Sequence, residues 1–214
     1  MPTAVQRVFL CSNMVNPEHG LSANRLLRGL ASSVLMGKHL VGLGHCRIGY
    51  VALDEPEHTA QQDRLAGFRQ ALQSAGCDVS SDGMILTKTL SVDDGLRAGD
   101  RFLEMRHRPS AVFCSGDQLA VGFLARVLER GLRVPDDVAV VGYDDIRYAE
   151  FLKVPLTTVA LPKTEMGRQA AGILFERIAG GYNDADKRQV KLAPRLVVRA
   201  SCGANALERD QHGA

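Results

Sequence analysis

The sequence predicts an α/β protein whose strands pair mostly in parallel. From Cys46 onward, short apolar runs alternate with longer amphipathic segments, which is typical of strand–helix–strand units. The run Val138–Val141 is apolar throughout, as expected of a strand that helices cover on both faces. Two adjacent carboxylates, Asp144 and Asp145, follow at its carboxyl end, and ligands of parallel sheets bind at that edge.

The individual elements follow from this alternation and from signals at helix ends. Asp117 precedes one helical pattern as an expected N-cap, and Gly76 and Gly131 follow helical patterns as expected C-caps. The apolar, often β-branched runs predict strands at Arg47–Leu53, Met84–Leu86, Ala111–Cys114, Val138–Val141, Thr157–Leu161 and Arg195–Arg199. Apolar residues at spacings of three to four predict helices at Ser32–Leu43, Gln61–Ala75, Val92–Arg106, Gln118–Arg130 and Thr164–Ala179.

Composition limits the class of protein. The chain has 214 residues, of which 45% are hydrophobic and 23% charged, as in ordinary globular domains. Its 26 basic and 24 acidic residues leave a net charge of +2 without any block of like charge, so no nucleic-acid-binding surface is expected. No apolar stretch approaches the ~18 residues of a membrane span, and the first residues do not resemble a signal peptide. We therefore expect a cytoplasmic protein.

Cysteines and histidines give no sign of a disulfide framework, a metal site or a cofactor. The five cysteines are an odd number without a C-x-x-C pair, which favours reduced, mostly buried thiols. His39 and His45 are six residues apart, a spacing that does not place two ligands on one helix face. No nucleophile elbow, phosphate-binding loop or dinucleotide fingerprint occurs, so we do not expect an enzyme.

Two segments carry a resemblance to a known family. Residues 132–159 read LRVPDDVAVVGYDDIRYAEFLKVPLTTV, and residues 39–50 read HLVGLGHCRIGY. Both resemble the effector-binding domain of the lactose-repressor (LacI/GalR) group of bacterial transcription regulators, over about Val5–Ala204. The resemblance implies a type-I periplasmic-binding-protein-like fold, with two doubly wound parallel-sheet lobes of which the first is truncated.

The resemblance also predicts how the chain divides. The remnant of the N-terminal lobe is expected at residues 5–45 and 157–190, the C-terminal lobe at 46–156 and 191–204, and a tail at 205–214. Val5–Cys11 resembles a strand midway through the first lobe, and the helix-turn-helix headpiece has no counterpart. We expect the helix Thr164–Ala179 to pack on the remaining first-lobe sheet, and this lobe to be the less stable one.

The candidate binding residues follow strands of the second lobe. In the family, the Arg of R-L-A-G-F and the first Asp of G-Y-D-D contact the effector, which implies these roles for Arg64 and Asp144. Ser115 and Asp117 follow the Ala111 strand and are expected at the same edge. An arginine fork facing a carboxylate suits the hydroxyls of a sugar or the ring nitrogens of a purine. Asp145 is expected to have a structural role.

The chain departs from the family pattern at three places. It has Gly116 where many members have a polar side chain, Arg28 and Gly29 where an Asp-Asn pair is usual, and Leu161 where a Gln is common. The pocket is therefore expected to be either altered or unused. The sparse aromatic residues nearby, Tyr143, Tyr148 and Phe151, are expected to pack within the protein rather than to stack on a ligand.

The resemblance implies the ligand-sensing domain of a LacI-family transcription regulator. A small polar effector would bind between the lobes, the family's full-length members usually form homodimers, and DNA would be contacted only through a headpiece that this chain lacks. The alternatives are a solute-binding protein of a sugar transporter, or a truncated remnant without function.

Overall fold

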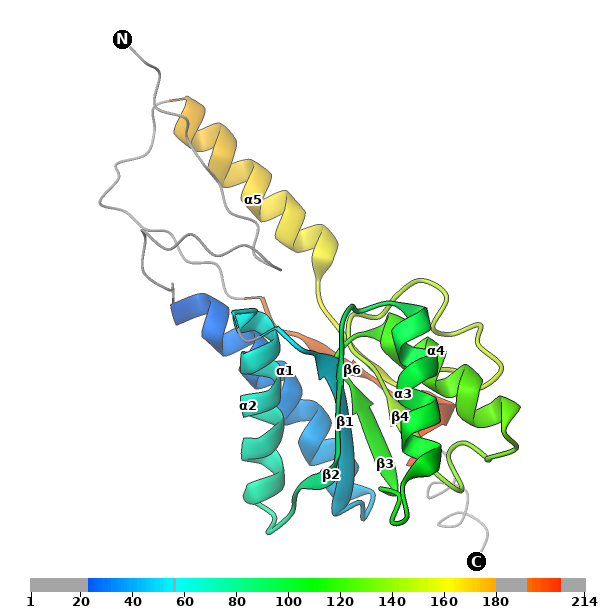
Figure 1. Cartoon of the computed structure of the whole chain (residues 1–214). Coiled ribbons are helices and arrows are strands. Elements are labelled where there is room, and N and C mark those ends of the chain that lie inside the picture. The colour runs from blue at the N-terminus through cyan, green and yellow to red at the C-terminus, as the bar shows by residue number, and fades with distance from the viewer. Residues whose placement is uncertain (1–22, 56, 180–191, 205–214) are drawn as a thin grey trace, which may run out of the picture.

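A four-stranded parallel sheet forms the centre of the molecule (Figure 1). The structure is a computed structural model that describes residues 23–55, 57–179 and 192–204. The predicted strand Val5–Cys11 and the tail lie outside these residues. The strand order is β2-β1-β3-β4, with β1 at Arg47–Leu53, β2 at Asp78–Thr87, β3 at Ala111–Cys114 and β4 at Ala139–Val141. The parallel sheet predicted from the apolar runs is confirmed.

Two helices cover each face of this sheet. Helix α1 (Ala23–Gly42) precedes β1, and α2 (Thr59–Gln73), α3 (Val92–Glu104) and α4 (Asp117–Glu129) each connect consecutive strands. In Figure 1, α1 and α2 lie on one side of the sheet and α3 and α4 on the other. The expectation that Gly76 and Gly131 are C-caps is wrong, because the C-caps of α2 and α4 are Ser74 and Arg130. The two glycines follow these caps, with φ values of +70° and +83° that favour glycine. None of the described helices is long and apolar enough to cross a membrane.

Successive side chains of the strands point alternately toward the two helix layers. Ile48, Tyr50 and Ala52 of β1 face the core under α1 and α2, whereas Val51 faces the core under α3 and α4. Strand β3 alternates in the same way. Both faces are therefore buried, as the continuous apolar runs predict.

A second sheet pairs β5 (Thr158–Ala160) with β6 (Arg195–Val197), and a short 3₁₀ helix follows at Ala200–Cys202. This pair is antiparallel. Parallel bridges from Val141 to Thr157 and from Asp144 to Ala160 place β5 beside the end of β4. The second sheet therefore lies beside β4, next to the carboxyl end of that strand, where Asp144 and Asp145 follow.

Helix α5 (Lys163–Ile178) projects away from the body of the molecule (Figure 1). The predicted first-lobe strand Val5–Cys11, on whose sheet this helix is expected to pack, lies outside the described residues, and the contacts of α5 with the other described helices and strands are marginal. Phe175 and Ile178 are 69% and 66% exposed. The physical reason is that no described strand lies beside this helix to cover its apolar side chains.

Helix α1 packs on the four-stranded sheet rather than with α5. Its residues Met36 and Leu40 are fully buried in the same core as Phe68 of α2 and Tyr50 of β1. The family resemblance places residues 5–45 in the first lobe, whereas α1, in the described part of this range, packs on the same sheet as α2. We propose that the lobe boundary lies before α1.

Cys46 and Cys77 form a disulfide, so the expectation of reduced thiols is wrong for this pair. The two residues are 31 positions apart, but each directly precedes one of two neighbouring strands, β1 and β2. Their spacing in the sequence contains no sign of this proximity. Cys114 and Cys202 are free and buried, as expected.

Helices α3 and α4 approach each other through glycines. A Cβ on Gly122 would lie 2.0 Å from the carbonyl oxygen of Val92, and one on Gly95 would lie 2.3 Å from that of Leu119. We expect Gly122→Ala to lower the free energy of unfolding by about 2 kcal/mol, because the two backbones must separate. Urea denaturation measures this change.

The matched control is Gly172→Ala in α5, where a Cβ would meet no atom within 4 Å. Since alanine favours a helix, this variant is expected to be neutral or stabilising by up to ~1 kcal/mol. Equal effects of the two substitutions would contradict the close packing of α3 on α4.

Candidate functional site

The structure brings Arg64, Ser115 and Asp144 together at the carboxyl edge of the four-stranded sheet. Arg64 of α2 is 8% exposed, and its Nη1 donates a hydrogen bond to the carbonyl oxygen of Ser115 at 2.5 Å. The guanidinium carbon lies 3.8 Å from the ring centroid of Tyr143, in a cation–π contact. Both contacts fix a planar cation at the ends of β3 and β4.

Asp144 is half-buried and follows β4 in a backbone conformation that side chains rarely adopt, with φ at +114°. The N–H of Asp144 donates to the carbonyl oxygen of Val159 at 2.9 Å, and Lys163 Nζ donates to the carbonyl oxygen of Asp144 at 2.5 Å. Such strain is found preferentially at functional sites. Burial raises the pKa of the Asp144 carboxyl, and the positive charges of Arg64 and Lys163 act against this rise.

Several buried polar atoms at this edge have no hydrogen-bond partner among the described residues. They are Ser115 Oγ, Arg64 Nε and both amide atoms of Gln61, which precedes Arg64 by one turn on α2. Buried polar atoms normally have partners, so these atoms are available to water or to a ligand. Sequence reasoning missed Gln61, because a polar residue on an amphipathic helix is expected on the exposed face; its position three residues before Arg64 is the available signal.

Leu90 is a second residue that sequence reasoning missed. A Cβ built on Gly116 would lie 3.9 Å from Leu90 Cδ2 and 4.0 Å from Asp144 Oδ2. The leucine side chain and the carboxylate therefore flank the same glycine. This arrangement adds an apolar surface beside the charged groups.

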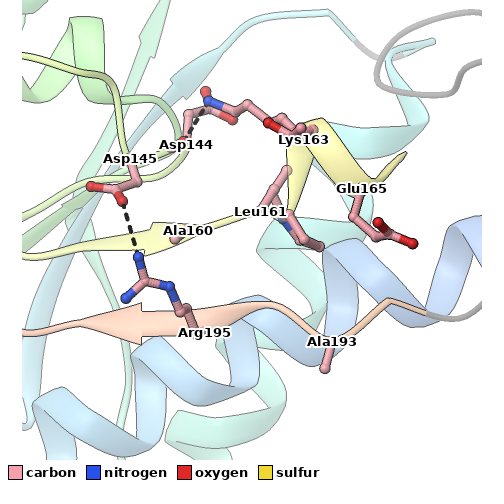
Figure 2. Close-up of a pocket in the computed structure, with 10 residues that line it drawn as sticks. Asp144, Asp145, Ala160, Leu161, Lys163, Glu165, Ala193 and Arg195 are labelled. Atoms are coloured by element: carbon pink, nitrogen blue, oxygen red, sulfur yellow. Dashed lines mark hydrogen bonds and ion pairs between the residues drawn. The ribbon is translucent and has the colours of Figure 1, made fainter. Parts of the chain in front are cut away.

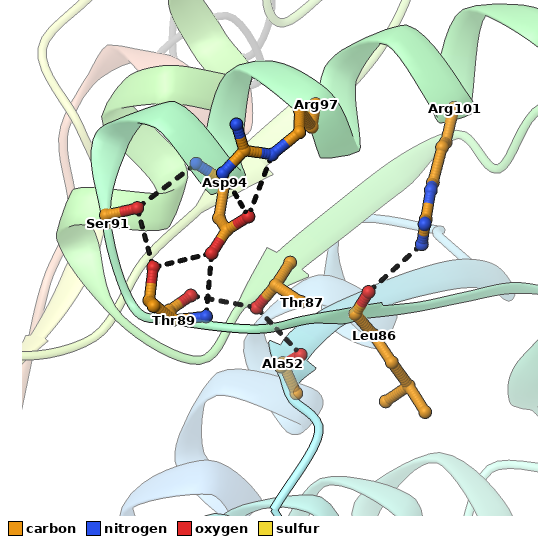
Figure 3. Close-up of polar contacts among 8 residues, drawn as sticks. All are labelled: Ala52, Leu86, Thr87, Thr89, Ser91, Asp94, Arg97 and Arg101. Carbon is orange, nitrogen blue, oxygen red and sulfur yellow. Dashed lines mark hydrogen bonds and ion pairs between the residues drawn. The ribbon is translucent and has the colours of Figure 1, made fainter.

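The loop that carries Leu90 is held by a hydrogen-bond network around Asp94, which is 4% exposed (Figure 3). Asp94 Oδ2 accepts from Thr89 N at 2.7 Å and from Thr89 Oγ1 at 2.5 Å, and Oδ1 accepts from Arg97 Nη2 at 2.7 Å. The hydroxyl of Thr89 and the guanidinium of Arg97 lower the pKa of this carboxyl. Ser91 Oγ accepts from Asp94 N at 3.2 Å and caps α3. The network fixes Leu90 relative to the sheet edge.

Asp117 lies at the same edge but uses both carboxylate oxygens inside the protein. Oδ1 accepts from Thr158 Oγ1 at 2.6 Å, and Oδ2 accepts from Ile146 N at 2.9 Å. The expectation that Asp117 is the N-cap is wrong, because α4 begins at this residue and its N-cap is Gly116. Burial raises the pKa of Asp117 to about 7. These bonds connect α4 to the first residue of β5 and to the loop after β4.

Asp145 also has partners within the protein. It pairs with Arg199 at 2.8 Å and with Arg195 at 3.8 Å. These ion pairs connect the end of β4 to β6, in agreement with the structural role expected for this residue.

A pocket of about 460 Å³ adjoins Asp144 at the start of α5 (Figure 2). This volume is within the range of small-molecule sites. Asp144 lines the pocket, whereas Arg64, Ser115 and Asp117 do not. The lining residues are Asp144, Asp145, Ala160, Leu161, Pro162, Lys163, Thr164, Glu165, Ala193 and Arg195. Asp144 therefore lies between the group formed by Arg64 and Ser115 on one side and this pocket on the other.

The expectation that the nearby aromatic residues pack within the protein is confirmed for Tyr143 and is wrong for Tyr148 and Phe151. Tyr143 is 2% exposed beneath Arg64, and its hydroxyl is 2.7 Å from Ser32 Oγ. Tyr148 and Phe151 are instead 45% and 77% exposed, because they lie on the loop after β4 at the surface of the described structure. In the described part of the chain, no group of three or more histidine, cysteine or acidic residues could hold a metal ion.

Comparison with known proteins gives consistent matches over most of the chain. Residues 38–202 match the family described as a periplasmic binding protein-like domain. An HTH-type transcriptional repressor PurR from Mannheimia succiniciproducens is 38% identical over 187 residues, which are 87% of this chain and 54% of that protein. The chain thus spans about half the length of the PurR relatives that it matches.

Solved structures give the same result. A LacI-family protein from Sanguibacter keddieii is 34% identical with a TM-score of 0.76, over 83% of this chain and 67% of that one. A LacI-family transcriptional regulator from Lactobacillus casei, solved with bound glucose, is 29% identical with a TM-score of 0.69, over 81% of this chain and 62% of that one.

Proposed function

We propose, from the premise that this chain belongs to the LacI family of periplasmic-binding-protein-like domains, that it is the effector-sensing part of a transcription regulator. The observation that carries the proposal is the contact of Arg64 with Ser115 beside the half-buried Asp144, at the carboxyl edge of the sheet. Ligands of open α/β sheets bind at this edge.

The effector in this proposal is a small polar molecule such as a sugar or a nucleobase. The Arg64 guanidinium donates hydrogen bonds to it, and the Asp144 carboxylate accepts them. The unpaired atoms of Gln61 and Ser115 supply further donors and acceptors. Leu90 supplies an apolar wall that excludes water from one side of the ligand. Asp117, whose oxygens are already bonded, positions the edge without touching the effector.

Regulation follows from a difference in affinity. The effector binds more tightly to one arrangement of the lobes and shifts the population toward it. The free energy of this shift cannot exceed the difference in binding free energy between the two arrangements. We propose that the complete regulator is a homodimer in the cytoplasm, that it contacts DNA through a separate headpiece, and that the effector controls this contact.

A thermal-shift screen tests the proposal. The purified chain is heated with glucose, sucrose, cellobiose, adenine or guanine, and we expect at least one compound to raise the melting temperature, because it binds only the folded state. The same compound must fail to stabilise an Arg64→Ala variant that is shown to be folded by circular dichroism. Equal stabilisation of both proteins would place the ligand elsewhere and contradict the proposed site.

A further inference from the structure

The disulfide between Cys46 and Cys77 lies at the amino edge of the sheet, opposite the candidate effector site. The two Cα atoms are 5.1 Å apart. Cys46 is exposed and Cys77 is half-buried, whereas Cys114 and Cys202 are buried and free. Because thiol–disulfide exchange requires access to a sulfur atom, this bond is the accessible redox group among the described cysteines.

The disulfide joins the two residues that directly precede the neighbouring strands β1 and β2. Cys46 directly precedes β1 and follows the end of α1, where His45 N donates to the carbonyl oxygen of Leu40 at 3.0 Å. Cys77 directly precedes β2, and its own N–H donates to the carbonyl oxygen of Leu72 at 2.9 Å. The bond therefore holds the end of α2 and the start of β2 against β1.

The disulfide stabilises the start of β2 against β1, because few residues pair in this part of the strand. It is an edge strand whose hydrogen-bonded neighbour is β1. Arg47 and Ile48 pair with Asp78 and Val79 beside the disulfide, and pairing then resumes at Tyr50. Residues 80–83 lie outside the register, since Met84 is the partner of Tyr50. Two residue pairs are thus separated from the rest of the ladder.

The carboxyl end of β2 is held by side-chain hydrogen bonds that do not involve the disulfide (Figure 3). Thr87 Oγ1 donates to the carbonyl oxygen of Ala52 at 3.1 Å, and Arg101 Nη1 donates to that of Leu86 at 3.0 Å. Loss of the disulfide therefore leaves this end in place. The opening that follows is confined to the start of the strand.

We propose that Cys46 and Cys77 form a reversible redox site that takes small thiols of the glutathione class and controls the pairing of the first part of β2. A thiolate attacks one protein sulfur, forms a mixed disulfide and releases the other sulfur as a thiolate. A second small thiolate then displaces the remaining protein sulfur. Two electrons pass from the two small thiols to the protein, their two protons end on Cys46 and Cys77, and the small thiols leave as their disulfide.

Peptide mapping and amide hydrogen exchange of the full chain test this inference. A Cys11→Ser background removes exchange with that cysteine. In buffers of oxidised glutathione, we expect a Cys46–Cys77 linkage that disappears in reduced glutathione and returns on reoxidation. Reduction should make the amides of residues 78–80 exchange about tenfold faster while those of residues 84–87 keep their rates.

Cys77→Ser provides the second variant, since it should show the fast exchange of residues 78–80 in both buffers. The inference is overturned if the linkage does not form, if exchange at 78–80 is the same in both states, or if residues 84–87 open equally. None of these readouts uses an effector, so they are independent of the proposed function.

Discussion

Asp117→Ala is expected to lower the free energy of unfolding by about 3 to 4 kcal/mol at pH 5. The substitution leaves Thr158 Oγ1 and Ile146 N without the acceptor that each now has, at 2.6 Å and 2.9 Å. The site is closed to water, since Asp117 is 1% exposed. Because the carboxyl group joins α4 to β5 and to the loop after β4, its loss loosens three parts of the edge together. Urea denaturation followed by circular dichroism measures the change.

The effect of this residue should also depend on pH. The folded-state pKa of Asp117 is about 7, raised by burial above the ordinary value of 3.8. The sign follows from linkage: a raised pKa contributes stability that is fully present below about pH 4 and is lost as the pH rises through 7. The full difference amounts to a few kcal/mol, at ~1.4 kcal/mol for each pKa unit.

Asp117→Asn is the matched variant for this pH dependence. It keeps the shape and one acceptor but cannot ionise, so it should lie below the wild type in stability at pH 5 and approach it by pH 8. If the difference between the two proteins is the same at pH 5 and pH 8, Asp117 does not have a raised pKa in the folded chain.

Arg64→Ala is expected to weaken effector binding by about 100- to 1000-fold, or about 3 to 4 kcal/mol. The guanidinium is the buried cation beside Asp144, and its loss removes one of the two positive charges that act against the burial-induced rise in the pKa of that carboxyl. Arg64→Lys keeps a positive charge but not the planar fork that contacts Ser115 and Tyr143, so a loss of about tenfold is expected. Titration calorimetry with the compound that stabilises the wild type measures both values.

Arg69→Ala supplies the control for these titrations. Arg69 is on the same helix as Arg64 but is exposed, so its removal should change the affinity by less than about twofold. A loss of affinity equal to that of Arg64→Ala would mean that the net charge of α2, rather than the placed guanidinium, attracts the ligand.

The central sheet could be predicted from the sequence because its signal is local. Buried parallel strands need continuous apolar runs, and β1 and β3 have the predicted bounds. Strand β2 begins at Asp78 rather than at Met84. Its first residues, Asp78–Ser81, are mostly polar and lie at an edge of the sheet, where only Asp78 and Val79 pair with β1. A run of apolar residues cannot reveal that part.

The candidate site was predictable where a strand end fixes the position. Arg64, Ser115 and Asp144 lie at one edge because β1, β3 and β4 are parallel neighbours. Leu90 and Gln61 were missed for a different reason. A loop network around Asp94 brings Leu90 to the site, and packing against other elements buries Gln61, so neither position follows from local periodicity.

A crystal structure of the chain with its stabilising compound tests the central claim most directly. The account predicts that polar atoms of the compound lie within ~3.2 Å of both the Arg64 guanidinium and the Asp144 carboxylate, with Leu90 against an apolar face. A compound seated instead against Arg195 and Glu165 in the pocket at the start of α5, without contact to Arg64, would contradict it.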